Sequence, residues 1–136
     1  MDLRAYQQWV EEFDRARGWD LCPATDSLAH LVEELGEVTR CILVLHGYRP
    51  STPAEKEDWR NQLGEELADL VTFAVKLAYT YQLDLASFLQ ENRIKCETRY
   101  GGLEQNFNQT QEYLQVLAKN SVEMLTEYQK RFGEKE

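Results

Sequence analysis

Two stretches of the chain repeat apolar residues at steps of three and four, and each carries two carboxylates three residues apart. The first stretch holds Glu34 and Glu37, and the second holds Glu66 and Asp69. Steps of three and four are typical of one face of an α-helix, so two amphipathic helices are predicted, with each acidic pair along the edge of an apolar stripe. The expected stripes are Leu28, Leu31, Val32, Leu35, Val38, Ile42 and Leu45 within residues 27–45, and Leu63, Leu67, Leu70, Val71, Ala74 and Leu77 in the next helix.

Antiparallel packing of these two helices would gather the four carboxylates into one cluster. Like charges at short range repel one another, and a divalent cation between them relieves the repulsion. Mg²⁺ prefers oxygen ligands and keeps open positions for water and substrate phosphates. Either acidic pair alone is equally well explained as a solvated helix surface. Together they predict a site for Mg²⁺ or Mn²⁺, with one to three ions, whose ligands are Glu34, Glu37, Glu66 and Asp69.

No stretch alternates polar and apolar residues as a half-buried strand does, so the predicted fold class is all-α. We find no internal repeat and no domain linker in the sequence. The expected helices cover residues 2–17, 27–45, 53–81, 85–100 and, with looser spacing, 103–132.

Several residues predict where these helices begin and end. Gly18 suits the left-handed position after a helix. Asp26 or Ser27 is expected to cap the central helix, and Asp84 the fourth. Thr52 begins the sequence Thr-Pro-Ala-Glu, which is typical of a capping box with proline at the first helical position.

One face of the helix expected over residues 85–100 changes from apolar residues to polar and basic ones. Apolar residues in its first half are followed on that face by Asn92, Lys95 and Arg99. Unpaired buried charge is costly, so these cations are expected to meet the carboxylates or a metal-bound polyphosphate, whose oxygens accept from both lysine and arginine. The alternative is that the helix end leaves the core and both side chains reach water.

The net charge of -9 at pH 7 argues against nucleic acid or an anionic membrane as the main partner. Three cysteines without a Cys-x-x-Cys pair indicate neither a disulfide framework nor a zinc site, and reduced thiols are typical of a cytoplasmic protein. No apolar run approaches the roughly 20 residues of a membrane span, and the N-terminus does not resemble a signal peptide. We therefore expect a cytoplasmic location.

Other chemistry has less support. The chain has no Glu-x-x-His for a di-iron bundle, no Gly-x-Ser-x-Gly and no phosphate-binding glycine loop. His30, four residues before Glu34, is either structural or in contact with that carboxylate, and Glu33 is expected to be solvated or supporting. Trp19 belongs either to the core or to a base pocket, for which Phe73 is a second candidate.

The two acidic motifs resemble those of a known enzyme family. Glu-Leu-Gly-Glu, ending at Glu37, followed by Glu-Leu-Ala-Asp, ending at Asp69, resembles the Glu-x-x-Glu … Glu-x-x-Asp signature of the all-α nucleoside triphosphate pyrophosphohydrolases, the MazG-like enzymes. The segment Lys-Cys-Glu-Thr-Arg-Tyr, beginning at Lys95, is similar to the family's basic segment. The resemblance covers roughly residues 3–101.

The resemblance implies Mg²⁺-dependent cleavage of a nucleoside triphosphate, or its deoxy form, between the α and β phosphates, which gives a monophosphate and pyrophosphate. Nucleotide-pool sanitation would be the biological role. It implies a homodimer or a dimer of dimers, whose site can draw residues from a neighbouring subunit. By this resemblance Glu34, Glu37, Glu66 and Asp69 are catalytic metal ligands, and Lys95, Arg99 and Asn92 contact phosphate.

The resemblance also implies the domain organisation. Residues 1–102 would form a catalytic antiparallel four-helix bundle of the MazG-like kind. Residues 103–136 would form a C-terminal helical extension, packed on the same domain or on a dimer partner. Two alternatives stay open: a phosphoribosyl-ATP pyrophosphohydrolase of histidine synthesis, and a non-enzymatic acidic helical module that binds other proteins.

Overall fold

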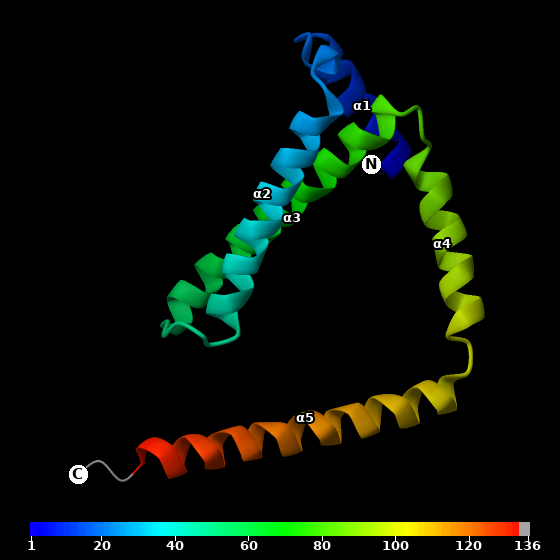
Figure 1. The fold of residues 1–136 in the computed structure, drawn as a ribbon. Helices are drawn as coiled ribbons and strands as arrows, with labels where there is room; N and C mark the ends of the chain where they lie inside the picture. Colours follow the sequence, from blue (N-terminus) through cyan, green and yellow to red (C-terminus); the bar gives the residue numbers. More distant parts are fainter. Residues whose placement is uncertain (134–136) are drawn as a thin grey trace. The chain divides into compact units, whose positions relative to one another are not determined.

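The structure is a computed structural model that describes residues 1–133, and it confirms the all-α prediction (Figure 1). The described residues contain no strand. Residues 134–136, the last three of the predicted C-terminal extension, lie outside the described residues. The helices are α1 (Leu3–Arg15), the short 3₁₀ helix η1 (Trp19–Leu21), α2 (Ala24–Leu45), α3 (Pro53–Thr80), α4 (Leu85–Arg99) and α5 (Leu103–Phe132).

Two of the predicted helix starts are confirmed in detail. At α3 the Thr52 hydroxyl accepts from the Glu55 backbone N–H at 3.3 Å, and the Glu55 carboxylate accepts from the Thr52 N–H at 2.6 Å. These reciprocal bonds satisfy two backbone donors that the first turn leaves unpaired. At α4 the Asp84 carboxylate accepts from the Ser87 backbone N–H at 3.3 Å.

The turn between α1 and α2 agrees with the prediction at Gly18, whose φ of 70° is left-handed. The predicted start of α2 is wrong, because the helix begins at Ala24, two residues before Asp26. Pro23 is extended and its carbonyl accepts from the Asp26 N–H at 2.9 Å, so the first turn is already closed when the chain reaches Asp26 and Ser27.

The chain divides into two compact units, one of residues 1–90 and one from Glu91 onward. The first contains α1, α2, α3 and the beginning of α4. The second contains the remainder of α4 and α5. The division falls at a different place from the predicted domains, 1–102 and 103–136, which stay predictions. None of the helices in residues 1–133 has the length and apolar character that a membrane span requires.

Within the first unit, α2 and α3 pack side by side as an antiparallel pair, and α1 packs on α3 (Figure 1). The connection between α2 and α3 is short, so the two long helices run together for most of their length. The buried apolar side chains are Val10 of α1, Val38, Cys41 and Val44 of α2, and Val75 and Ala78 of α3.

Part of the predicted α2 stripe is wrong, because these side chains are exposed rather than packed on α3. Leu28, Val32, Leu35 and Ile42 keep between 49 % and 59 % of their surface accessible. Apolar residues cover more than one side of α2, so periodicity alone fits two rotations of the helix. In the structure the packed side passes through Val38 and its neighbours, and Glu34 lies on that side, one helical turn earlier. Leu67 and Val71 of α3 are likewise about half exposed.

Candidate metal centre

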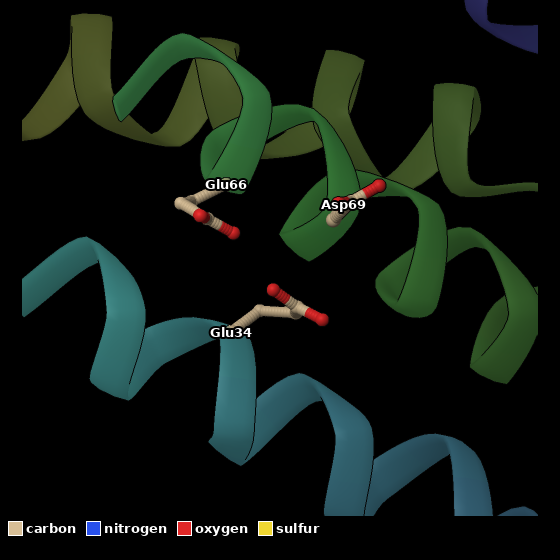
Figure 2. A group of neighbouring side chains, drawn as sticks. All are labelled: Glu34, Glu66 and Asp69. Atoms are coloured by element: carbon tan, nitrogen blue, oxygen red, sulfur yellow. The ribbon is translucent and has the colours of Figure 1, made fainter. Parts of the chain in front are cut away.

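Three of the four predicted carboxylates face one another between α2 and α3 (Figure 2). One ligand oxygen from each of Glu34, Glu66 and Asp69 lies within 4.8 Å of the other two. Glu34 projects from α2, whereas Glu66 and Asp69 stand three residues apart on α3 and therefore share a side of that helix. We call these three residues the acidic trio.

Glu37 lies outside the trio. Its carboxylate pairs with the Arg40 guanidinium on the same helix, at 3.5 Å, and keeps 40 % of its surface exposed. Glu37 stands three residues from Glu34, the spacing that Glu66 and Asp69 also have, so the pairing with Arg40 rather than the spacing distinguishes it. Its role as a ligand stays a prediction.

The acidic trio carries unrelieved negative charge. None of its carboxylates forms an ion pair with another residue of the described chain, and the one side-chain donor is the Gln62 amide, 3.3 Å from Glu66. Burial raises the pKa of the Glu34 carboxyl, and a hydrogen bond with Glu66 and the charges of Asp69 and Glu66 raise it further. The site therefore favours a positive ion or a proton.

The donor set of the trio fits a hard divalent cation. It offers carboxylate oxygens and no imidazole or thiolate, which suits Mg²⁺, Mn²⁺ or Ca²⁺ better than zinc or copper. Three carboxylates also leave coordination positions free for water and phosphate oxygens. The geometry thus suits the ion that the sequence predicts without identifying it.

A pocket of about 280 Å³ lies further along the same two helices. Trp19 of η1 and Phe73 of α3, the two predicted base-pocket residues, both line it. Phe73 follows Asp69 by one helical turn, and His30, another lining residue, precedes Glu34 by one turn. The structure therefore brings the two aromatic residues together beside the acidic trio, and Trp19 is half exposed rather than a core residue.

His30 contacts the pocket aromatic rather than the trio. Its ring stacks on Phe73, with centroids 5.1 Å apart and planes 19° apart. Its Nδ1 lies 3.1 Å from the Glu33 carboxylate, which is 68 % exposed. Glu33 is therefore largely solvated, as expected.

Sequence reasoning missed a buried polar cluster on the floor of this pocket. Asp14 of α1 is 1 % exposed, accepts from the Lys76 ammonium at 2.9 Å, and accepts from the Tyr79 hydroxyl at 2.6 Å. Burial raises the pKa of Tyr79, and the hydrogen bond to Asp14 and its charge add to the effect. The available signal was periodicity, because Asp14 follows Val10 by one turn on the inner side of α1.

Asn92, Lys95 and Arg99, the predicted phosphate contacts, all lie on α4 within the second compact unit. Their spacing of three and four residues keeps them on one side of that helix. The Arg99 guanidinium lies 5.3 Å from the ring centroid of Tyr100. Their contact with phosphate stays a prediction.

No family model matches the chain. A protein of Bacillus subtilis (strain 168) described as "Uncharacterized protein YvdC" is 29 % identical to this chain over 104 residues, which cover 74 % of the chain and 97 % of that relative. The chain is similar to this protein along nearly the whole length of the relative, and the description gives no activity.

Proposed function

We propose that the protein is a Mg²⁺-dependent nucleoside triphosphate pyrophosphohydrolase that acts in nucleotide-pool sanitation. The observation that carries the proposal is the acidic trio, three carboxylates within 4.8 Å across a helix pair and without a cationic partner in the described chain. The resemblance of the two acidic motifs to the MazG-like signature supports the same conclusion, and so does the aromatic pocket beside the trio.

In this proposal the carboxylates bind the metal ion and the basic residues of α4 bind the phosphates. Glu34, Glu66 and Asp69 would hold the ion, with Glu37 as a further expected ligand. These carboxylates would hold Mg²⁺, which when bound would neutralise phosphate oxygens and lower the pKa of a coordinated water. Water would attack the phosphorus in line and pyrophosphate would leave. By the family resemblance, Lys95 and Arg99 are expected to donate to the phosphate oxygens.

The pocket supplies the other half of the substrate contact. Trp19 and Phe73 would line the base site, with His30 stacked on Phe73, since aromatic rings contact bases of any sequence. We include a homodimer or a dimer of dimers in the proposal, in which a neighbouring subunit can complete the site.

The test is pyrophosphate release from a nucleotide panel, including phosphoribosyl-ATP, in Mg²⁺ and in EDTA. We expect release to require Mg²⁺ and to fall by at least about 100-fold in Glu34→Gln and Asp69→Asn, because each removes a charge from the ion's ligand set. Glu65→Gln is the matched control, since this glutamate adjoins Glu66 but is exposed and outside the trio. Wild-type rates in both trio variants would overturn the site, and a panel without any cleavage would overturn the function.

A further inference from the structure

We propose that Lys76 selects nucleotides whose base carries a carbonyl oxygen at C6 of a purine or at C4 of a pyrimidine, by donating a hydrogen bond to that oxygen inside the pocket. This inference rests on the proposed function, because it treats the pocket beside the acidic trio as the base site. It assigns the substrate class to keto bases, such as uracil, hypoxanthine and guanine, over amino bases such as adenine.

Lys76 is held in a fixed position at the floor of the pocket. Its ammonium lies 2.9 Å from the Asp14 carboxylate, and Asp14 is itself fixed by the Tyr79 hydroxyl at 2.6 Å. The Lys76 side chain is only 16 % exposed. The same ammonium lies 5.3 Å from the ring centroid of Trp19 and 5.6 Å from that of Phe73. The ammonium therefore lies over both aromatic rings, and a base that enters the pocket beside these rings would meet it.

The ammonium has donors to spare and no capacity to accept. A lysine carries three N–H donors, and Asp14 takes one of them. No other hydrogen bond joins Lys76 to a residue of the described chain through its side chain. Two N–H groups thus stay available to a ligand in a pocket that Trp19, His30 and Phe73 line together with polar side chains, among them Asp26 and Ser27.

Donor-only chemistry discriminates between base edges. A carbonyl oxygen accepts from the ammonium, and a hydrogen bond to a charged group contributes about 1.5–3 kcal/mol. An exocyclic amino group at the same place turns its own N–H toward the ammonium, which leaves donors on both sides unpaired and costs affinity. The two effects act in the same direction, so keto bases should bind at least about 10-fold more tightly.

Helix α3 sets the distance between this group and the phosphates. Lys76 follows Asp69 by seven residues, two turns along one side of the same helix, which corresponds to a rise of about 10 Å. A nucleotide whose phosphates meet the acidic trio would extend along α3 toward Lys76. Base selection and phosphate binding would then be performed by a single helix.

The test uses equilibrium binding, which does not depend on catalysis. Calorimetric titration in EDTA compares inosine with adenosine 5′-monophosphate and uridine with cytidine 5′-monophosphate, since each pair exchanges a carbonyl for an amino group. We expect the keto member to bind at least about 10-fold more tightly to the wild type, and the ratio to fall to within about 2-fold in Lys76→Met. Lys56→Met, at the start of the same helix, is the control and should keep the wild-type ratio.

The variant that removes Lys76 alone leaves Asp14 without its cation, so Asp14→Asn/Lys76→Met provides a second protein without the buried charge. Equal affinities for the two members of each pair in the wild type would overturn the inference, and so would the absence of any monophosphate binding. A keto preference that persists in Lys76→Met would show that the lysine has only a structural role. A keto preference without cleavage of any triphosphate would overturn the proposed function and leave this inference standing.

Discussion

Replacing Glu34 by glutamine should stabilise the protein in EDTA and destabilise it, relative to wild type, in Mg²⁺. In the structure an oxygen of Glu34 lies within 4.8 Å of oxygens of both Glu66 and Asp69. The substitution removes the charge at the centre of this repulsion and keeps the size and the hydrogen-bonding capacity of the side chain. A hard cation loses one of its charged ligands through the same change.

The magnitude follows from the separation. At 4.8 Å two like unit charges repel by about 0.9 kcal/mol in water and by about 3.5 kcal/mol at an effective dielectric constant of 20. Solvent at the exposed Asp69 carboxylate reduces this value. We therefore expect a gain of about 1 kcal/mol in EDTA, which corresponds to a rise in Tm of roughly 4 °C for a chain of this length.

Mg²⁺ should reverse the order of the two proteins. At a hundredfold excess over its Kd, the ion would add about 2.7 kcal/mol to the wild type, and far less to Glu34→Gln. The assay is thermal unfolding followed by circular dichroism, in EDTA and in Mg²⁺, with Glu65→Gln as the control of equal charge. The reasoning is refuted if Glu34→Gln has the same Tm as Glu65→Gln in EDTA. It is also refuted if Mg²⁺ raises the Tm of Glu34→Gln by as much as that of the wild type.

The same site gives a pH dependence with a definite sign. The pKa of Glu34 is raised above its ordinary value of 4.5, so the folded protein binds this proton more tightly than the unfolded chain does. In EDTA the unfolding free energy should therefore fall as the pH rises from about 4.5 through the raised pKa, relative to Glu34→Gln, which has no proton to lose there.

Three further predictions concern the rest of the first unit. Asp14→Ala should lower the unfolding free energy by about 3 kcal/mol, because it leaves the Lys76 ammonium buried without its counter-ion; urea unfolding checks this, and a loss under about 1 kcal/mol would contradict it. Thr52→Ala should cost about 1 kcal/mol in the same assay through loss of the cap, and no change would show that the cap does not matter. Hydrogen bonds from Ser87, followed by Arg4, lower the pKa of Asp84 to about 2. Carbon NMR titration should show this pKa rising in Ser87→Ala, and an unchanged value would assign the shift to another cause.

The sequence predicts much of the secondary structure, because local signals determine helix ends. Thr52 and Asp84 cap their helices as expected, since a capping side chain bonds to backbone a few residues away. The predicted cap of α2 is wrong, because Pro23 is extended and the helix begins directly after it, before Asp26.

The site is predicted less completely, because it depends on how helices rotate against one another. Glu34, Glu66 and Asp69 meet as expected, whereas Glu37 turns toward Arg40. The apolar residues of α2 allow two rotations, and only packing on α3 decides between them. The partners of Lys76 could not be predicted at all, because Asp14 is 62 residues away in the chain and only tertiary structure brings them together.

Trp19 stands on η1, outside both long helices, while Glu66, Asp69 and Phe73 share the continuous rod of α3. Inserting one residue into α3 after Asp69 would rotate every later residue of the helix by about 100° about its axis. Phe73 would then no longer face the same side as Glu66 and Asp69. Changes in the short turn that carries Trp19 meet no such constraint. Relatives of this protein could thus change the contact that Trp19 makes with a base by altering the turn, while Lys76 and the carboxylates of α3 keep their spacing.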